Sequence, residues 1–435
     1  MDSDSLLRTI RSLGLDADFE VTCTSAVNSG LKIAGGAFNI ALINETEAVG
    51  VRCICHGRMG LATASLGSKD ALKIAIESAY KLAKQAGATD SQSGFSKMKI
   101  RDNQRRRGRM GQFKEENTIK EVRDAVQSIS ALKKVYSVNA FLDHSSKKVS
   151  IANSNGVVGD YESTTANILA EITAKYKGDQ ASGIKIQEAR DYSGLDIPST
   201  FKNAADTAVS LLGSKQAPTF RGQVLISPEA ANGLVGDFIA AMSGEEVYKH
   251  RSFLKDKLGD KIASELLNIT EDPSLPKSPY SRTFDDELIP TAKKDLVSNG
   301  VLKTYLHNIY SAEKMGVRST GNAFRTSGGF VGATNLIIRR GEETMQDLLG
   351  RIDEGIYLLD TEDSPNMSTG DLSAMVSAGY YIKKGKIMYP VKETMIGINM
   401  IDLMRNISAL SKEVFEISGI STPAILAKNV KISGK

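Results

Sequence analysis

The chain has 435 residues, a formal net charge of +4, three cysteines and no tryptophan. This length exceeds one ordinary hydrophobic core, so it predicts two domains of about 200 residues each. No apolar run approaches the roughly 20 residues that a membrane-spanning helix needs, and the N-terminus lacks a signal-peptide pattern. The small charge does not indicate nucleic acid, and three cysteines form no disulfide framework, which favours a cytoplasmic protein.

The first half predicts a sheet with helices. Apolar and polar residues alternate through most of residues 18–65 and 134–188, with turn signals such as Gly35-Gly36 and His56-Gly57, which predicts antiparallel strands. Apolar residues at helical spacing predict four helices. They cover residues 5–12, a segment starting at Ser68 with Leu72, Ile76, Ala79 and Leu82 inward, a segment around 119–129, and residues 199–212. The N-terminal domain is therefore predicted to be α+β.

A connection containing Ser, Gln and Pro lies between residues 213 and 221. We place the domain boundary there, so residues 1–215 form the N-terminal domain and 216–435 the C-terminal domain. A short strand ends at Ile226, and Ser227-Pro228 starts a helix with Leu234, Phe238, Ile239 and Met242 on one face. Short strands and turns dominate the remainder, which predicts a β-rich, curved or barrel-like sheet.

Seven short phrases in this half occur in an order that resembles the TldD/TldE (PmbA) family of metallopeptidase-related proteins. They are Ser243-Gly244, Ser252-Phe253-Leu254 with Lys257-Leu258-Gly259, Thr283-Phe284-Asp285, Asn299-Gly300-Val301-Leu302, Ser319-Thr320-Gly321-Asn322-Ala323, Thr369-Gly370-Asp371-Leu372-Ser373 and Tyr389-Pro390-Val391. The resemblance implies a two-domain protein that dimerises, often as a TldD–TldE heterodimer. In that heterodimer the zinc-bearing subunit cleaves unfolded or leader peptides held as an extended strand.

The active branch of this family carries a His-Glu-x-x-x-His zinc motif at the helix that starts near residue 227. The two histidine positions fall on Ser227 and Asn232, and the glutamate position falls on Pro228. The resemblance also implies a cysteine ligand near the C-terminus, but this chain has no cysteine after Cys55. A catalytic zinc needs about three protein ligands and an open position for water. Every expected ligand is thus replaced, which is typical of a non-catalytic subunit.

We therefore expect a TldE/PmbA-like subunit with no cofactor of its own and zinc only in a TldD-like partner. By resemblance and by glycine placement, the candidate peptide-groove residues are Ser319, Thr320, Gly321, Asn322, Thr369, Gly370 and Asp371. Extended peptides are the expected ligands, bound by β-augmentation. A homodimer is a further possibility.

A self-sufficient metallopeptidase with unrecognised ligands is the first alternative. Glu246 and His250 are four residues apart, but we interpret them as an exposed helical pair. We interpret Cys53 and Cys55 as small buried hydrophobes on one strand face, with His56 on the other. Asp285, Asp286 and Glu287 are interpreted as solvated carboxylates in a turn, and Asp371 as a turn residue that bonds its own backbone.

A nucleic-acid or gyrase-interacting protein is the second alternative, in line with the name "modulator of DNA gyrase" attached to the family. Residues 97–114 carry eight basic side chains and one acid, Asp102. Such a run can contact phosphates by counterion release. It contains one aromatic residue and no DNA-binding motif, so we favour a solvated loop between two helices.

Overall fold

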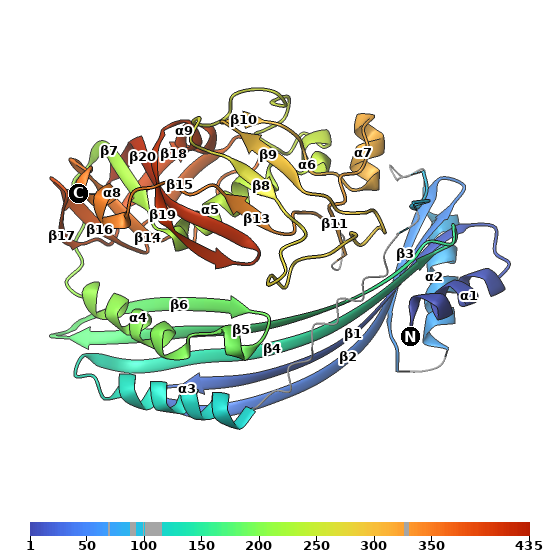
Figure 1. Ribbon diagram of the computed structural model, residues 1–435, viewed down its shortest axis with the longest axis horizontal. Helices are drawn as coiled ribbons and strands as arrows, with labels where there is room; N and C mark the ends of the chain where they lie inside the picture. The colour runs from blue at the N-terminus through green and yellow to red at the C-terminus, as the bar shows by residue number, and fades with distance from the viewer. Residues whose placement is uncertain (68–69, 88–92, 99, 101–114, 326–329) are drawn as a thin grey trace.

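The computed structural model describes residues 1–67, 70–87, 93–98, 100, 115–325 and 330–435. Two large β-sheets organise them: a six-stranded sheet from residues 18–189 and a twelve-stranded sheet from residues 220–433 (Figure 1). Helices pack against both sheets, so the predicted α+β class is confirmed. Among these described residues, no helix has the length and apolarity to cross a bilayer.

The N-terminal sheet consists of antiparallel strands in the order β3-β2-β1-β4-β5-β6. The strands are β1 (Asp18–Ala34), β2 (Ala37–Cys55), β3 (Arg58–Ser65), β4 (Val135–Asn153), β5 (Val158–Tyr176) and β6 (Asp179–Ala189). Gly35, Gly36, His56 and Gly57 have positive φ at the two predicted turns, as tight hairpins require. The predicted antiparallel strands are therefore present, and β1 lies in the centre between β2 and β4.

Four helices cover one face of this sheet, with one pair at each end (Figure 1). They are α1 (Ser3–Ser12), α2 (Ala71–Gln85), α3 (Glu115–Ser130) and α4 (Ile197–Ser210). A short 3-10 turn, η1 (Tyr192–Gly194), precedes α4. All four predicted helices are present; Ser68, the predicted start of the second, lies outside the described residues, and α2 begins at Ala71. One predicted core residue is wrong, because Leu82 is 49% exposed while Ala83 is fully buried. The small Ala83 side chain is needed there because α2 lies directly on the edge strand.

Each edge strand of this sheet carries a glycine where a helix approaches closely. A Cβ built on Gly60 in β3 would lie 2.0 Å from the carbonyl oxygen of Ala79, and one on Gly183 in β6 would lie 2.2 Å from that of Ala204. Helix α2 presents Ala79 and Ala83 to its glycine, and α4 presents Ala204 and Ala208 to the other. The same glycine-against-alanine packing therefore docks a helix at both edges.

Gly60→Ala is expected to destabilise the protein by about 1–3 kcal/mol, because the new methyl group overlaps helix backbone. Urea unfolding measures the change. Gly50→Ala in β2 is the matched control, since no atom lies within 4 Å of its added Cβ. Equal stabilities of the two variants would contradict the close approach of α2.

The C-terminal sheet is mixed and branched around β20, which pairs with four strands. Its strands are β7 (Phe220–Ile226), β8 (Ile269–Glu271), β9 (Lys294–Ser298), β10 (Val301–Leu302), β13 (Leu336–Ile338), β14 (Glu354–Asp360), β15 (Asp371–Met375), β16 (Ala378–Lys383), β17 (Lys386–Pro390), β18 (Met395–Asn399), β19 (Ile407–Ile417) and β20 (Ile420–Ser433). A separate ribbon joins β11 (Ala323–Phe324) to β12 (Phe330–Val331). Strands β10 and β17 are the first and last strands of the order β10-β9-β8-β13-β20-β7-β14-β16-β17 and do not pair with each other. The described strands therefore form an open sheet and not a closed barrel.

Helix α5 (Pro228–Ala240) packs on β20 and supplies the centre of the C-terminal core. Its predicted core residues Leu234, Phe238 and Ile239 are buried, and Met242 is buried just beyond the helix end. The other helices of this half are short. They are α6 (Gly244–Tyr248), α7 (Ile309–Met315), α8 (Met345–Gly350) and α9 (Met400–Arg405).

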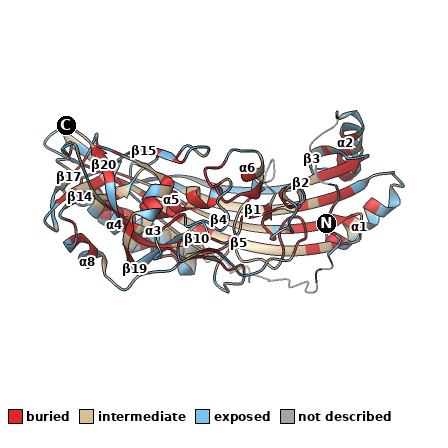
Figure 2. Cartoon of the chain, turned by 90° about the horizontal axis from the view of Figure 1, so that it is seen from above, coloured by how far each residue is buried: buried red, intermediate tan, exposed pale blue. Residues whose placement is uncertain are grey.

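The two halves meet on the sheet face that the helices leave free. Phe284 and Leu288 pack on Val149 and Ile151 of β4, and Gly159 of β5 leaves room for the Phe284 ring. In β1 and β4, burial is greatest near the end that carries α1 and α2 and lower in the middle (Figure 2). The junction between the halves is therefore a packed interface and not a flexible tether.

Candidate functional site

Ser227 ties the start of α5 into the fold. It is 1% exposed, its amide donates to the carbonyl oxygen of Leu358 at 2.8 Å, and its Oγ donates to that of Leu359 at 3.2 Å. The same Oγ accepts the N–H of Ala230 at 3.1 Å, which makes Ser227 the N-cap. Pro228 takes the first helical position, where its missing N–H costs nothing. Both residues therefore serve the helix start.

One turn along α5, Asn232 holds the hairpin turn between β19 and β20. It is 7% exposed, and its Nδ2 donates to the carbonyl oxygens of Ile420 at 2.9 Å and Ile417 at 3.4 Å. Ser418 and Gly419, between these carbonyls, have φ of 51° and 76°, as tight hairpin turns require. The Asn232 amide thus presents a donor at a position where a metal ligand would need a lone pair.

The donor set at the start of α5 does not fit a catalytic zinc. A capping hydroxyl, an imino ring and a carboxamide that is already bonded offer none of the histidine, cysteine or carboxylate ligands that zinc prefers. The neighbouring Glu229 pairs with Lys185 of β6 at 2.6 Å. Nowhere in the described ranges do three or more His, Cys, Asp or Glu residues gather in a way that could hold a metal ion.

Asn232→Ala is expected to destabilise the protein by about 1–3 kcal/mol, because it removes the donor to the carbonyl groups of two half-buried residues. Chemical denaturation measures this change. Asn203→Ala, at an exposed position on α4, should change stability by less than about 0.5 kcal/mol. An equal, small effect at both sites would contradict the structural role of Asn232.

The first candidate groove segment, residues 319–322, supports His307. Ser319 Oγ donates to the His307 carbonyl oxygen at 3.0 Å, and Thr320 Oγ1 accepts the His307 N–H at 2.7 Å. Gly321 has a φ of 72°, and a Cβ there would lie 2.7 Å from the Pro290 carbonyl oxygen. Ser319 and Thr320 remain half-buried, so they are the accessible members of the segment.

Asn322, the last residue of that segment, is fully buried. Its Nδ2 lies 2.9 and 3.0 Å from the two carboxylate oxygens of Glu271 and 2.8 Å from the Gly332 carbonyl oxygen. Its Oδ1 accepts from Lys294 Nζ at 3.1 Å. Lys294 also pairs with Glu271 at 2.6 Å, so Asn322 completes a buried polar cluster behind the segment.

The second candidate groove segment, residues 369–371, lies beside the start of α9. Thr369 Oγ1 donates to Asp371 at 2.8 Å, and Asn399 Nδ2 donates to the same carboxylate at 3.1 Å. These side-chain bonds lower the pKa of Asp371. The prediction that Asp371 bonds its own backbone is therefore wrong, because its carboxylate accepts from the side chains of Thr369 and Asn399. Gly370 has a φ of 80°, as the turn requires. Thr369 and Asp371 are exposed.

Both segments connect to the chain that follows α5. Leu306, just before His307, donates its amide to the Met242 carbonyl oxygen at 2.9 Å, and Phe253 donates to Met367 at 2.8 Å. A Cβ on Gly370 would lie 3.2 Å from the Phe253 ring. At a rise of 1.5 Å per residue, α5 separates this end from Ser227 by about 20 Å. The groove candidates and the degenerate motif therefore occupy opposite ends of α5.

The interpretation of Asp285, Asp286 and Glu287 as solvated carboxylates is wrong. They are 0%, 4% and 2% exposed because the loop that carries them packs against the N-terminal sheet. Asp285 accepts three backbone N–H groups, from Glu287, Ile289 and Ala323, each at 2.9 Å. This carboxylate is therefore a structural anchor of the loop.

Asp286 and Glu287 form a buried charge cluster with residues of both halves. Arg325 Nη2 lies 2.9 Å from Glu20 Oε1 and 3.0 Å from Glu287 Oε1, and Arg52 Nη1 lies 2.9 Å from the same Glu287 oxygen. Arg282 and the Tyr161 hydroxyl both bond Asp286. We call Glu20, Arg52, Arg282, Asp286, Glu287 and Arg325 the junction cluster. Glu20 and Arg52 face each other across β1 and β2, on the face opposite the helices.

Burial raises the pKa of Glu20 to about 7 and that of Glu287 to about 8, although Arg52 opposes both shifts. A folded-state pKa above the unfolded value gives a stability contribution that is full below about pH 4.5 and is lost as pH rises through 7 to 8. Stability should therefore fall from pH 5 to pH 8.5, and Glu20→Gln with Glu287→Gln should flatten that fall. Urea unfolding at both pH values tests this, and an unchanged slope in the double variant would contradict it.

Comparisons with known proteins support the resemblance. Residues 219–434 match the PmbA/TldA metallopeptidase C-terminal domain, and residues 113–212 match the central domain of the same family. The chain belongs to the PmbA/TldD metallopeptidase family. It is 28% identical over 429 residues to a protein named metalloprotease PmbA homolog from Haemophilus influenzae, covering 96% of this chain and 92% of the relative.

Solved structures of this family have the same fold. A Thermotoga maritima protein, described as a candidate modulator of a DNA gyrase, superposes with a TM-score of 0.85 at 26% identity and covers 99% of both chains. TldE from Thermococcus kodakarensis superposes with a TM-score of 0.86 at 23% identity, again covering 99% of both chains. The PmbA/TldD fold therefore extends over the whole chain.

Other candidates in this PmbA/TldD chain have ordinary structural roles. Cys53 and Cys55 are buried in the core beneath α2, where burial raises the pKa of the Cys53 thiol to about 12. Glu246 pairs with Arg251, and His250 follows α6 with a φ of 56°, so the predicted helical pair of Glu246 with His250 is wrong. Most of the basic stretch at residues 97–114 lies outside the described residues.

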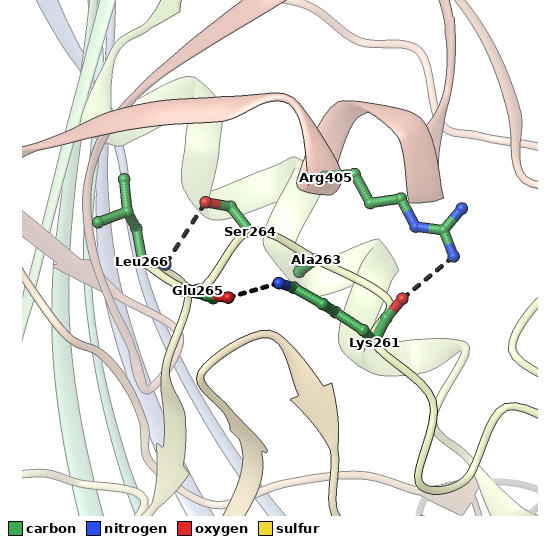
Figure 3. Close-up of a pocket in the computed structure, with 6 residues that line it drawn as sticks. All are labelled: Lys261, Ala263, Ser264, Glu265, Leu266 and Arg405. Atoms are coloured by element: carbon green, nitrogen blue, oxygen red, sulfur yellow. Dashed lines mark hydrogen bonds and ion pairs between the residues drawn. The ribbon is translucent and has the colours of Figure 1, made fainter.

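Surface cavities lie on the C-terminal half and between the two halves. One of about 500 Å³ is lined by Lys261, Glu265 and Arg405, among others, and Figure 3 shows Arg405 bonded to the Lys261 carbonyl while Lys261 pairs with Glu265. Both partners of that pair are more than half exposed, so it is a solvated ion pair of little energetic weight. The other cavity, of about 470 Å³, lies between the halves.

Proposed function

We propose that this chain is a TldE/PmbA-like subunit that carries no catalytic zinc and works with a TldD-like, zinc-bearing peptidase. One observation carries the proposal: all three motif positions are used by the fold itself. Ser227 caps a helix, Pro228 begins it, and Asn232 fastens the β19–β20 turn. The side chains at the three motif positions are thus engaged in starting the helix and holding the turn.

The role in the complex is to complete the walls of a peptide groove. The exposed Thr369 and Asp371 and the half-buried Ser319 and Thr320 are the residues that can meet an extended peptide. Gly321 and Gly370 hold the turns that present them, and Asn322 supports the first segment from the buried side. Each half, 1–215 and 216–435, is proposed as one domain, and the reduced, buried cysteines suit a cytoplasmic protein.

Assembly tests the proposal. Co-expression with a zinc-bearing relative of the same family, followed by light scattering on the eluted peak, should give a one-to-one heterodimer. Failure to associate under conditions where each chain is folded would overturn the proposed partnership. A stable homodimer that cleaves peptides alone would favour the self-sufficient peptidase.

Asp371→Ala tests the groove within that complex. Removal of the carboxylate should reduce the rate of peptide cleavage by the heterodimer without affecting assembly. Glu362→Ala, an exposed carboxylate outside the segment, is the matched control. Equal cleavage by both variants would remove residues 369–371 from the groove.

A further inference from the structure

The cavity between the halves is built from three separate parts of the chain. The end of β6 contributes Glu188 and Ala189, the loop 275–280 contributes Leu275 and Tyr280, and the β19–β20 turn contributes its flanking residues. Strand β6 is the last strand of its sheet, and β19 pairs along its length with β20. Its volume of about 470 Å³ lies within the range of small-molecule sites.

The walls of this cavity are fixed by contacts of their own. A Cβ on Gly419 would lie 3.1 Å from the Tyr280 ring, so glycine allows the ring to lie against the turn. The Tyr280 hydroxyl donates to Glu188 Oε2 at 2.7 Å, and the Ser418 amide also donates to Glu188. Asn232 holds Ile417 and Ile420 from behind. The cavity is therefore preorganised, which lowers the cost of binding.

The cavity is lined by the Glu188 carboxylate, whose donors Tyr280 and Ser418 are neutral groups. Glu188 is half-buried, burial raises its pKa, and within the described ranges it forms no ion pair with Lys, Arg or His. Asp143, on the same sheet face, adds negative potential. The nearby Arg190 donates to the carbonyl oxygens of Lys277 and Ser278. Lys277 and Glu416 are exposed at the rim and oppose each other in charge.

We propose that this cavity binds an organic cation on an aliphatic stem, of which a lysine side chain is the simplest example. Glu188 pairs with the ammonium group, while Leu275, Leu336, Ile417 and Ile420 surround the methylene groups. The cation can belong to a polypeptide or to a small amine, because the recognised chemistry is the same. This site lies apart from the groove segments and does not depend on a partner subunit.

Calorimetric titration of the purified full-length chain alone tests the proposal. The probes are Nα-acetyl-lysine methylamide, its neutral analogue Nα-acetyl-norleucine methylamide, n-butylamine and a short peptide with one central lysine. The lysine probe should bind saturably and about 10-fold or more tighter than norleucine, as expected for a charge-assisted bond. Equal affinity of the two, or no saturable binding of any cationic probe, overturns the proposal. Tighter binding of the peptide than of butylamine identifies a polypeptide source, and the reverse identifies a small amine.

Glu188→Gln removes the charge but keeps an acceptor for Tyr280, so the fold should be retained. Its affinity for the lysine probe should fall about 10-fold or more. Glu416→Gln at the rim should change that affinity by less than about twofold, since exposed charges contribute little. An unchanged affinity in a folded Glu188→Gln protein overturns the proposal. Neither result depends on whether the heterodimer forms.

Discussion

Arg325→Ala is expected to lower the free energy of unfolding by about 3–5 kcal/mol, the largest effect of any single substitution considered. Its guanidinium pairs with Glu20 and Glu287, whose side chains are 1% and 2% exposed. Without Arg325, Arg52 is left between two buried carboxylates. The cost arises from leaving charge unpaired in the interior and not from the intrinsic strength of the pairs. Urea unfolding at pH 8.5, where both carboxylates are charged, measures the loss.

Two variants make this prediction specific. Arg351→Ala removes an exposed pair with Glu343 and should cost no more than about 1 kcal/mol. Adding Glu20→Gln to Arg325→Ala should restore part of the stability, because Glu20 then carries no unpaired charge while Arg52 keeps its pair with Glu287. If this double variant were less stable than Arg325→Ala alone, the electrostatic explanation would be wrong and packing of the Arg325 stem would be the cause.

We expect the heterodimer to cleave peptides, with catalysis carried by the zinc site of the partner and not by this subunit. Inactivating the zinc motif of the TldD-like partner should abolish cleavage of an unfolded substrate. Ser227→Ala in this chain should leave the rate within about twofold, because loss of an N-cap costs only about 1 kcal/mol of stability. A fluorogenic peptide assay on complexes of verified composition measures both rates.

A matched comparison separates catalysis from assembly. Ala230→Gly also weakens the first turn of α5, yet it alters no group that could touch substrate. Ser227→Ala and Ala230→Gly should therefore have similar activities. A loss confined to Ser227→Ala would contradict the non-catalytic role assigned to this position.

Local periodicity was enough to predict the N-terminal sheet and its helices. Val122, Val126 and Ile129 follow helical spacing and are buried in α3, and Phe19, Val21 and Cys23 alternate along β1. These patterns depend on neighbours a few residues away. Leu82 was assigned wrongly because the close approach of α2 to Gly60 is a tertiary constraint that favours the smaller Ala83.

The β19–β20 hairpin and the junction cluster could not be predicted in this way. Strand β20 pairs with four others and yet contains Pro423, a residue that normally argues against a central strand. Glu287 meets an arginine 235 positions away in the chain, so three adjacent acids carried no local sign of burial. The one usable signal was Glu20, an acid within the apolar start of β1.

Metal content of the purified chain tests the central claim most directly. Chain purified alone and dialysed against trace zinc should contain far less than one zinc per molecule, and a chelator should leave its Tm unchanged. If the chain bound zinc, a free zinc concentration of 100 times the Kd would raise the free energy of unfolding by about 2.7 kcal/mol. A thermal scan would detect this as a rise in Tm of several degrees. One tightly bound zinc per chain, whose removal by a chelator lowers the Tm, would contradict the account.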